Sequence, residues 1–227
     1  MAIATRTYIA EAAEQALTGL RDNLAVDACP DSELVAEVAR LDVIEVERRM
    51  AEHHRPYVAL LDGSPAGYGW VASERASIGE LGLDIELPAR HLYLWDFGTL
   101  PAFRGRGVYP RLLAEIVRRE SVQGDRFWII YAPENLPSAA GIERAGFQPA
   151  AELSFGPDGR TALGVAGDEA LADMARALLN LPVIAEELDP CWRCGGCECE
   201  RDERGHCACA VARSRRSTPV DEKPAVV

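Results

Sequence analysis

The stretch 92–113 constrains the fold more than any other part of this 227-residue chain. Its first nine residues are mostly aromatic or aliphatic and include no Lys or Arg, which is typical of a buried strand, and Pro101 ends that strand because proline cannot donate to a ladder. Two glycines follow, Gly105 and Gly107, and from Val108 apolar residues recur at helical spacing. A strand, a glycine loop and a helix N-terminus in this order predict an anion site, because free backbone N–H groups and the helix dipole favour negative charge.

This loop and a second segment about thirty residues on resemble one known family. Arg104-Gly-Arg-Gly107 resembles the acyl-CoA pyrophosphate loop of GNAT-type N-acetyltransferases, and Asn135-Leu-Pro-Ser138 before Gly146-Phe147 resembles the family's Asn-x-x-Ser…Gly-Phe segment. The resemblance covers about 57–165. It implies an α/β fold with a GNAT-like mixed central sheet flanked by helices, and an acetyl-CoA-dependent N-acetyltransferase that transfers the acetyl group directly to a primary amine.

The resemblance also implies a set of residues that bind the acetyl-CoA co-substrate. They are Leu100, Arg104, Gly105, Arg106, Gly107, Val108, Tyr109 and Asn135. Asn135 has an alternative role as a helix cap. Two positions depart from the family pattern: Tyr109 replaces the last Gly or Ala of the loop, and Ile142 stands where many relatives carry a tyrosine that acts as general acid.

Several residues are candidates for proton transfer, with Glu134 and Glu74 as the weaker options for the base. Asp96 is the first candidate for the base, because it is the one acid in an apolar strand close to the expected thioester, where burial raises a carboxyl pKa toward a useful range. A buried carboxylate paired with an Arg or amide is the alternative reading. For the acid, Tyr131 and Ser138 are the candidates. His53 and His54 are expected on an exposed helix end.

The charge pattern restricts the partners. A net charge of −12 disfavours nucleic acid and favours cationic partners, although solubility alone also explains it. The polar stretch 73–90 is expected to form a long connection or a ragged hairpin, and its acidic residues either rim an acceptor site for a small-molecule or peptide amine or form a solvated loop. No apolar run reaches the ~18 residues that a membrane span needs, so we expect a cytoplasmic protein with no membrane partner. A homodimer is left open.

Six of the seven cysteines fall near the C-terminus, at short spacings typical of thiolate metal sites. The candidate metal ligands are Cys191, Cys194, Cys197, Cys199, His206, Cys207 and Cys209. Zinc is the first interpretation, and a reactive or disordered thiol tail, an iron–sulfur cluster and other soft metals are the alternatives.

The remaining patterns predict the organisation of the chain. Residues 8–50 are expected to be helical, with a first apolar face at 9–24, a break at 27–31 and a second face at 34–46. The expected domains are a GNAT-like acyltransferase domain at 1–166 (motif core 57–166), a helix and linker at 167–189, a cysteine-rich segment at 190–210 and a disordered tail at 211–227.

Two rivals to the N-acetyltransferase stay open. One is a non-catalytic acyl-CoA-binding module, suggested by the isoleucine at position 142. The other is a metal-sensing or thiol-sensing protein on an acyltransferase scaffold, suggested by the cysteines.

Overall fold

The structure is a computed structural model that describes residues 1–7, 23–79, 82–156, 158–188 and 191–192. The strands are β1 (Ala2–Thr7), β2 (Leu24–Ala28), β3 (Arg55–Leu61), β4 (Ser64–Ala72), β5 (Arg75–Ile78), β6 (Leu83–Glu86), β7 (His91–Thr99), β8 (Arg126–Tyr131), β9 (Gln148–Phe155) and β10 (Thr161–Val165). The helices are α2 (Ser32–Ala39), α3 (Val43–Ala51), α4 (Val108–Glu120), α5 (Leu136–Arg144) and α6 (Glu169–Leu179), with a short 3-10 helix, η1 (Pro101–Phe103).

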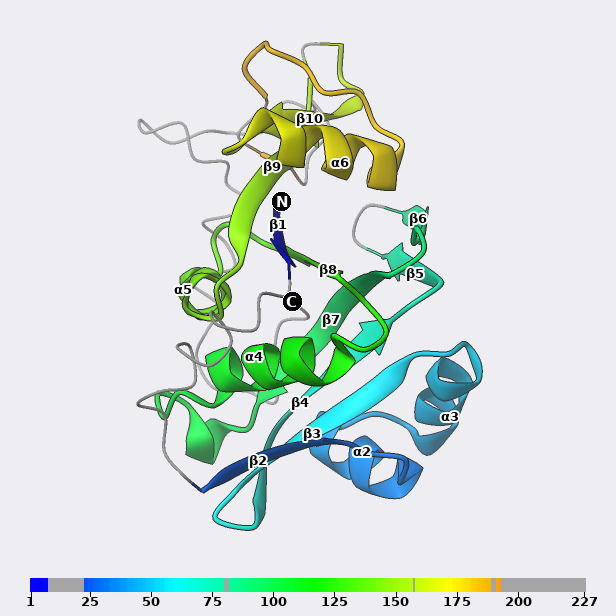
Figure 1. The fold of residues 1–227 in the computed structure, drawn as a ribbon, viewed down its shortest axis with the longest axis vertical. Coiled ribbons are helices and arrows are strands. Elements are labelled where there is room, and N and C mark those ends of the chain that lie inside the picture. The colour runs from blue at the N-terminus through cyan, green and yellow to red at the C-terminus, as the bar shows by residue number, and fades with distance from the viewer. Residues whose placement is uncertain (8–22, 80–81, 157, 189–190, 193–227) are drawn as a thin grey trace.

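One mixed sheet forms the centre of the molecule (Figure 1). Its strand order is β10-β9-β1-β8-β7-β4-β3-β2, and β5 and β6 form a separate two-stranded hairpin. All neighbouring strands are antiparallel except β7 and β8, which run parallel. The expected α/β fold with a mixed central sheet flanked by helices is therefore confirmed.

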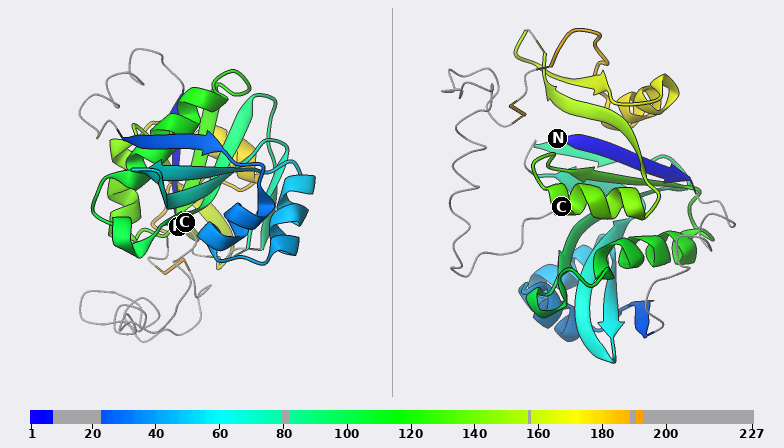
Figure 2. Two further views of the ribbon diagram at one scale, coloured as in Figure 1. Left: turned by 90° about the horizontal axis from the view of Figure 1, so that it is seen from below. Right: turned by 90° about the vertical axis from the view of Figure 1, so that its left-hand side faces the viewer.

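Helices cover both faces of the sheet (Figure 2). On one face α4 and α5 enclose a cluster that includes Leu112, Ile116 and Phe127. On the other face α2 and α3 pack over β3 and β4 around Trp70, while α6 and the β5–β6 hairpin pack around Trp128. The two helical layers keep water from both sides of β7 and β8, which explains why these strands are almost continuously apolar.

The N-terminal strand β1 was not predicted from the sequence, and it lies in the middle of the sheet. It pairs antiparallel with β8 on one side and β9 on the other, although about 120 and 145 residues of chain separate it from these partners. Ile3 faces the core and is 1 % exposed. Six residues are too few for a clear periodic pattern, so the strand is identified only by its pairing with distant parts of the chain.

Two expectations for the N-terminal region are wrong. Leu24, expected to end a helical face, begins strand β2, which pairs with β3; the rest of that face lies outside the described residues. The second face is not one helix but two, because Arg40 adopts a left-handed conformation that ends α2 and Asp42 caps α3. The side chain of Asp31 caps α2.

Later elements agree with the sequence patterns. The polar stretch after β4 forms the β5–β6 hairpin, Asn135 caps α5, and α6 lies within the stretch 167–189 that was expected to form a helix and linker. Among the described residues no helix has both the length and the apolarity that crossing a bilayer needs. The domain limits expected from the sequence stay a prediction.

The position of β1 can be tested with two isoleucines. We expect Ile3→Ala to lower the free energy of unfolding by about 2–5 kcal/mol, because it opens a cavity between the centre of the sheet and its covering layer. The matched control, Ile44→Ala, removes the same atoms from a residue that is 75 % exposed and should change stability by less than ~0.5 kcal/mol. Urea denaturation measures both, and equal effects would contradict a central β1.

Candidate active site

The glycine loop leads directly into α4. Gly105 and Gly107 have φ values of 71° and 75°, in the left-handed region that glycine adopts without the steric cost of a Cβ. Gly107 is the N-cap of α4, and no side chain among the described residues caps this helix. The first-turn N–H groups of α4 therefore have no helical partner. Val108 is 2 % exposed, so it offers a bound anion its backbone rather than its side chain.

Two arginines surround this helix end. Arg104 and Arg106 are exposed, and one nitrogen of Arg106 lies 3.7 Å from the Asp62 carboxylate. At this distance and exposure the ion pair is weak, so both guanidinium groups remain able to pair with an anion. The two glycines, the N-terminus of α4 and two exposed arginines thus lie within one short segment, 104–108, and its anion-binding role stays a prediction.

Strands β7 and β8 part halfway along their length. Their parallel pairing joins 91–94 with 126–129, and in the described part of the chain no strand pairs with this edge of β7 beyond that point. From Trp95 onward, peptide groups on one edge of β7 are therefore free to bind an extended ligand. Leu100, a predicted cofactor-binding residue just after β7, donates its N–H to Ala66 instead.

A β-bulge lies at the parting of the two strands. Tyr68 pairs with Gly98 and Trp70 with Trp95, so two residues of β7, Asp96 and Phe97, oppose the single Gly69 of β4. A Cβ on Gly69 would lie 2.1 Å from the Phe97 ring, so the ring needs a glycine beneath it. Asp96 has φ 47°, an uncommon conformation for a residue other than glycine.

The bulge turns Asp96 toward a buried arginine. The Asp96 carboxylate and the Arg49 guanidinium are 2.5 Å apart, and the two residues are 5 % and 8 % exposed. Arg49 also bonds Glu45 at 2.8 Å, and its head lies over the indoles of Trp95 and Trp70 at 4.5 and 5.1 Å. The cation is therefore held by two carboxylates and two aromatic faces.

The sequence analysis did not identify Arg49 as part of the site. A signal was present, because Arg49 follows buried Val46 by three residues and so lies on the inward face of α3. An arginine on an apolar helix face needs a buried partner, and Asp96 is the one that the fold provides. Whether Asp96 also acts as a base stays a prediction.

Ser138, a candidate acid, lies beside Tyr109 on the face of the sheet that α4 and α5 cover. The Tyr109 hydroxyl is 3.3 Å from Ser138 Oγ, and the Tyr109 ring lies edge-on to Phe97 at 5.7 Å. A Cβ on Gly141 would lie 2.4 Å from the Tyr109 ring, so that glycine makes room for the ring against α5. Burial raises the pKa of Tyr109 well above its usual value, although the hydrogen bond with Ser138 opposes the shift. Tyr109 therefore stays protonated at neutral pH.

Two other predicted site residues, Tyr131 and Asn135, precede Ser138 by a few positions in the chain. Tyr131 ends β8 and is half-buried, and burial, followed by the charges of Glu143 and Glu152, raises its pKa. Asn135 accepts a hydrogen bond from the Ser138 N–H at 3.2 Å, which caps α5. Their catalytic and cofactor roles stay predictions.

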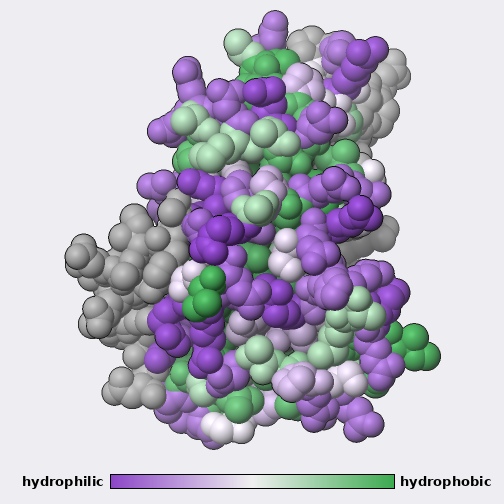
Figure 3. All heavy atoms as spheres, turned by 45° about the vertical axis from the view of Figure 1, so that its right-hand side comes forward, coloured by the Kyte–Doolittle hydropathy of each residue, from purple (hydrophilic) through white to green (hydrophobic). Residues whose placement is uncertain are grey.

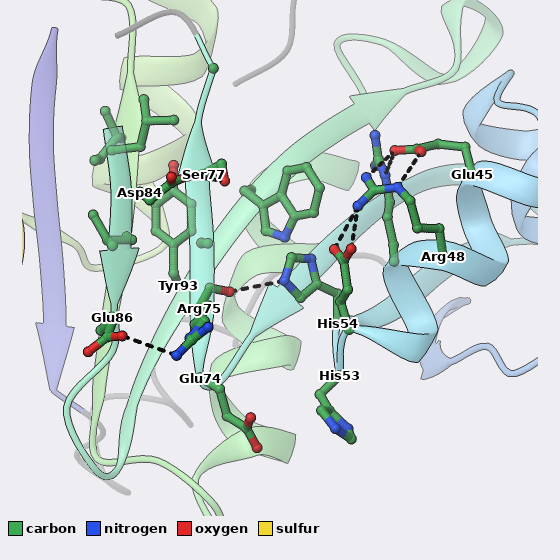
Figure 4. Close-up of a pocket in the computed structure, with 18 of the residues that line it drawn as sticks. Glu45, Arg48, His53, His54, Glu74, Arg75, Ser77, Asp84, Glu86 and Tyr93 are labelled. Carbon is green, nitrogen blue, oxygen red and sulfur yellow. Dashed lines mark hydrogen bonds and ion pairs between the residues drawn. The ribbon is translucent and has the colours of Figure 1, made fainter. Parts of the chain in front are cut away.

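A cavity of about 1110 Å³ lies on the opposite face of the sheet, between α3 and the β5–β6 hairpin (Figure 4). Tyr93 and Trp95 of β7 and Ile130 of β8 line it. Trp95 and Ile130 are the first residues beyond the last β7–β8 pair. The cavity therefore opens over the point where the strands part, on the other side from the glycine loop.

Charged side chains surround this cavity, and the surface on this side is mostly hydrophilic (Figure 3). The charged groups that line it are Glu45, Arg48, Arg49, Glu52, Glu74, Arg75, Asp84 and Glu86. Most are paired: Arg48 bonds Glu45 and Glu52, and Arg75 bonds Glu86. Hydrogen bonding to Arg48 is the main reason that the pKa of Glu45 is lowered to about 2. Glu74 is exposed and has no ion pair among the described residues. The lining holds five carboxylates and three guanidinium groups, so negative side chains are in excess.

The expectation that His53 and His54 are both exposed is wrong for His54, which is 8 % exposed. His53 adopts a left-handed conformation with φ 64° immediately after α3. This turn ends the helix and directs the next side chain inward, a reversal that residue types alone do not reveal.

The predicted metal site falls almost entirely outside the described residues. Cys191 is described and is buried, whereas Cys194, Cys197, Cys199, His206, Cys207 and Cys209 lie outside them. Within the described ranges no three His, Cys, Asp or Glu residues are close enough to hold a metal ion. The zinc interpretation stays a prediction.

Comparison with known proteins gives one family match. The model of the "Acetyltransferase (GNAT) family" matches residues 23–147. None of the curated proteins matches the chain.

Similar solved structures include an aminoglycoside N-acetyltransferase in complex with CoA, with 23 % identity, 55 % of this chain and 91 % of that chain covered, and a TM-score of 0.42. An acetyltransferase of Salmonella typhimurium with acetyl-CoA has 15 % identity, coverage of 60 % and 86 %, and a TM-score of 0.44. An aminoglycoside acetyltransferase from an uncultured soil metagenomic sample, with sisomicin, has 10 % identity, coverage of 55 % and 88 %, and a TM-score of 0.43.

The dependence of the bulge on its buried ion pair can be tested with two neighbouring arginines. We expect Arg49→Met to lower the free energy of unfolding by about 3–5 kcal/mol, because it leaves the Asp96 charge buried and unpaired. Arg48→Met removes a side chain that is 52 % exposed, and should cost less than ~1 kcal/mol.

The double variant Arg49→Met/Asp96→Asn removes both charges and should regain part of the loss. Chemical denaturation of the three variants measures these differences. A double variant less stable than Arg49→Met alone would contradict a mainly electrostatic role for the pair.

Proposed function

The chain belongs to the acetyltransferase (GNAT) family, and on that premise we propose that it moves an acetyl group directly from acetyl-CoA to a primary amine of a small molecule or peptide. The observation that carries this proposal is the parting of β7 and β8 at the Asp96 bulge. The proposed anion site would lie on one side of this opening, and a cavity lies on the other. A donor held on the first side and an acceptor held on the second meet at the opening.

The donor side suits a pyrophosphate followed by an extended arm. The amides of Gly105 to Tyr109 and the α4 dipole favour phosphate oxygens, while Arg104 and Arg106 add positive charge. The free edge of β7 from Trp95 to Thr99 can bond the amides of the pantetheine arm as an added strand would. A backbone N–H on this edge would also polarise the thioester carbonyl.

The acceptor side suits a cationic amine. The cavity is lined by five carboxylates and three guanidinium groups, and its floor carries the aromatic rings of Tyr93 and Trp95. An excess of carboxylates attracts an ammonium group, and an aromatic face stabilises it further. The hairpin strands β5 and β6 supply one wall, so their side chains would contribute to the choice of amine.

The departing sulfur would lie near the paired hydroxyls of Tyr109 and Ser138. A phenol kept protonated by burial can donate a hydrogen bond to a developing thiolate without giving up its proton. Tyr109 would then supply from α4 the hydroxyl that Ile142 cannot supply from α5.

A non-catalytic acyl-CoA-binding module is the second candidate, because Ile142 is 2 % exposed and belongs to the core at the position of the usual acid. Turnover assays separate the two candidates. Incubation with acetyl-CoA and a panel of polyamines, aminoglycosides and peptide amines should give free CoA and a mass increase of about 42 Da, the mass of an acetyl group that replaces a hydrogen, on one acceptor. Tight binding of acetyl-CoA without turnover on any amine would favour the binding module.

Gly107→Glu tests the donor site. The new carboxylate would lie at the helix end that binds phosphate, so we expect the affinity for acetyl-CoA to fall at least about tenfold by calorimetry, equivalent to ~1.4 kcal/mol. Gly159→Glu is the control, because Gly159 has a similar φ of 73° but lies in the β9–β10 turn. An unchanged affinity in Gly107→Glu would place the pyrophosphate elsewhere.

Asp96→Asn tests the predicted base while it keeps the volume of the side chain. If the carboxylate takes the proton of the amine, kcat/KM should fall roughly 10²–10⁴-fold, and the loss should shrink at higher pH because more amine arrives neutral. If its role is to hold Arg49 and the bulge, Tm should fall and the loss should not depend on pH. The pH dependence of kcat/KM beside a melting curve decides between these roles.

A further inference from the structure

His54 follows the end of α3, lines the cavity and contacts strand β5. Its ring lies edge-on to Trp95, with 5.1 Å between centroids and an interplanar angle of 84°. Its Nε2 lies 3.0 Å from the carbonyl oxygen of Arg75 (Figure 4). His54 is therefore a buried imidazole with one nitrogen fixed by the hairpin and with its ring packed on the residue where β7 leaves β8.

The Arg75 contact determines the tautomer of the ring. A carbonyl oxygen only accepts hydrogen bonds, so Nε2 of His54 must carry the hydrogen that it donates. In the neutral ring Nδ1 then carries a lone pair. This Nδ1 is buried and has no hydrogen-bond partner among the described residues.

Burial, more than the charged groups around it, keeps the His54 ring neutral. Burial is the largest cause of a lowered pKa, and Arg49 and Arg48 of α3 act in the same direction. The hydrogen bond to Arg75 of β5 and the charge of Glu52 oppose the shift. From β7 the ring meets Trp95, which carries no charge. His54 therefore holds its lone pair at neutral pH.

An unpartnered buried acceptor loses its hydrogen bonds to water without gaining others, and so calls for an explanation. The explanation suggested by position is a ligand, because His54 lines the cavity together with Trp95 and Ile130, the first residues beyond the last β7–β8 pair. A basic nitrogen at this place lies on the acceptor side of the opening where the thioester is expected.

We propose that His54 is a catalytic residue, whose Nδ1 accepts the proton of the acceptor ammonium in the cavity between α3 and the β5–β6 hairpin. This inference rests on the proposed acetyl transfer. Asp96 is the other candidate base, but its carboxylate already pairs with Arg49 at 2.5 Å. The His54 nitrogen has no such competitor among the described residues.

The step balances with acetyl-CoA and an alkylammonium as the only reactants. Nδ1 takes one proton from the ammonium, and the freed lone pair of the amine nitrogen attacks the thioester carbon. The C–N bond forms, the C–S bond breaks, and the electron pair of that bond leaves with sulfur. The second proton lost by nitrogen neutralises the thiolate, and His54 releases the first to solvent. The products are the amide, CoA thiol and one proton.

His54→Gln is the informative variant. A glutamine side-chain amide can still donate to the Arg75 carbonyl but offers no basic nitrogen. With the best amine of the panel, kcat/KM at neutral pH should fall about 10²–10⁴-fold, while the affinity for acetyl-CoA and Tm stay close to those of the wild type. The deficit should shrink as the pH approaches the pKa of the amine, roughly 10 for an alkylamine.

The pH profile distinguishes a base from a structural residue. Protonation removes the lone pair, so wild-type kcat/KM should fall as the pH drops through the pKa of His54, which lies below the usual value of about 6.5. His54→Gln should lack this acidic limb. His91→Asn is the matched control: His91 lies outside the cavity, its pKa is also lowered by burial, and asparagine keeps an acceptor for Trp128. That variant should keep the wild-type profile.

A second measurement needs no acceptor. Nitrogen NMR of the histidine rings across pH should show His54 with its hydrogen on Nε2 and with a pKa below that of a free histidine. A hydrogen on Nδ1, or a pKa at or above ~6.5, would overturn the assignment.

The kinetic outcomes separate this inference from the proposed function. If the wild type acetylates an amine and His54→Gln keeps its rate and its acidic limb, the inference fails and the acetyltransferase stands. If the wild type turns over no amine, the proposed function itself fails, and the role of His54 fails with it.

Discussion

The buried ion pair between Arg49 and Asp96 is the interaction on which the rest of the site depends. It joins α3 to the bulge of β7 through two residues that are 47 positions apart in the sequence. A left-handed aspartate is strained, and the strain persists because Arg49, held by Glu45 and two indoles, fixes where the carboxylate must lie. Through this contact the bulge keeps its shape, and the bulge sends neighbouring side chains to opposite faces of the sheet.

In the proposed reaction the two faces would serve different halves, because the sheet opens between them. Phe97 faces α4, where it meets Tyr109, and Trp95 faces the cavity and His54. A parallel pair of strands that stops after four residues leaves peptide groups free on one edge without exposing an outer edge of the sheet. The same geometry separates the proposed phosphate-binding surface from the proposed amine-binding cavity, so that charges of opposite sign need not share one pocket.

The cavity also depends on parts of the chain that lie far apart in sequence. Its walls come from α3 and from the β5–β6 hairpin, and one hydrogen bond from His54 to the Arg75 backbone connects them. The hairpin forms a sheet of its own and buries Ile78 and Ile85 against the layer that also holds Tyr93. A wall built by such a small element can change its side chains without disturbing the central sheet, which suits a surface that selects the acceptor.

The sequence by itself determined the elements that local chemistry specifies. The apolar strand ending at Pro101, the glycines of the loop and the cap at Asn135 each act within a few residues, so the strand–loop–helix unit, α5 and the α/β class could be predicted. Only the tertiary structure decided the remainder. Strand β1, the pairing of Arg49 with Asp96 and the burial of His54 are set by contacts across about 20 to 145 residues of chain, and no local pattern records a partner at that distance.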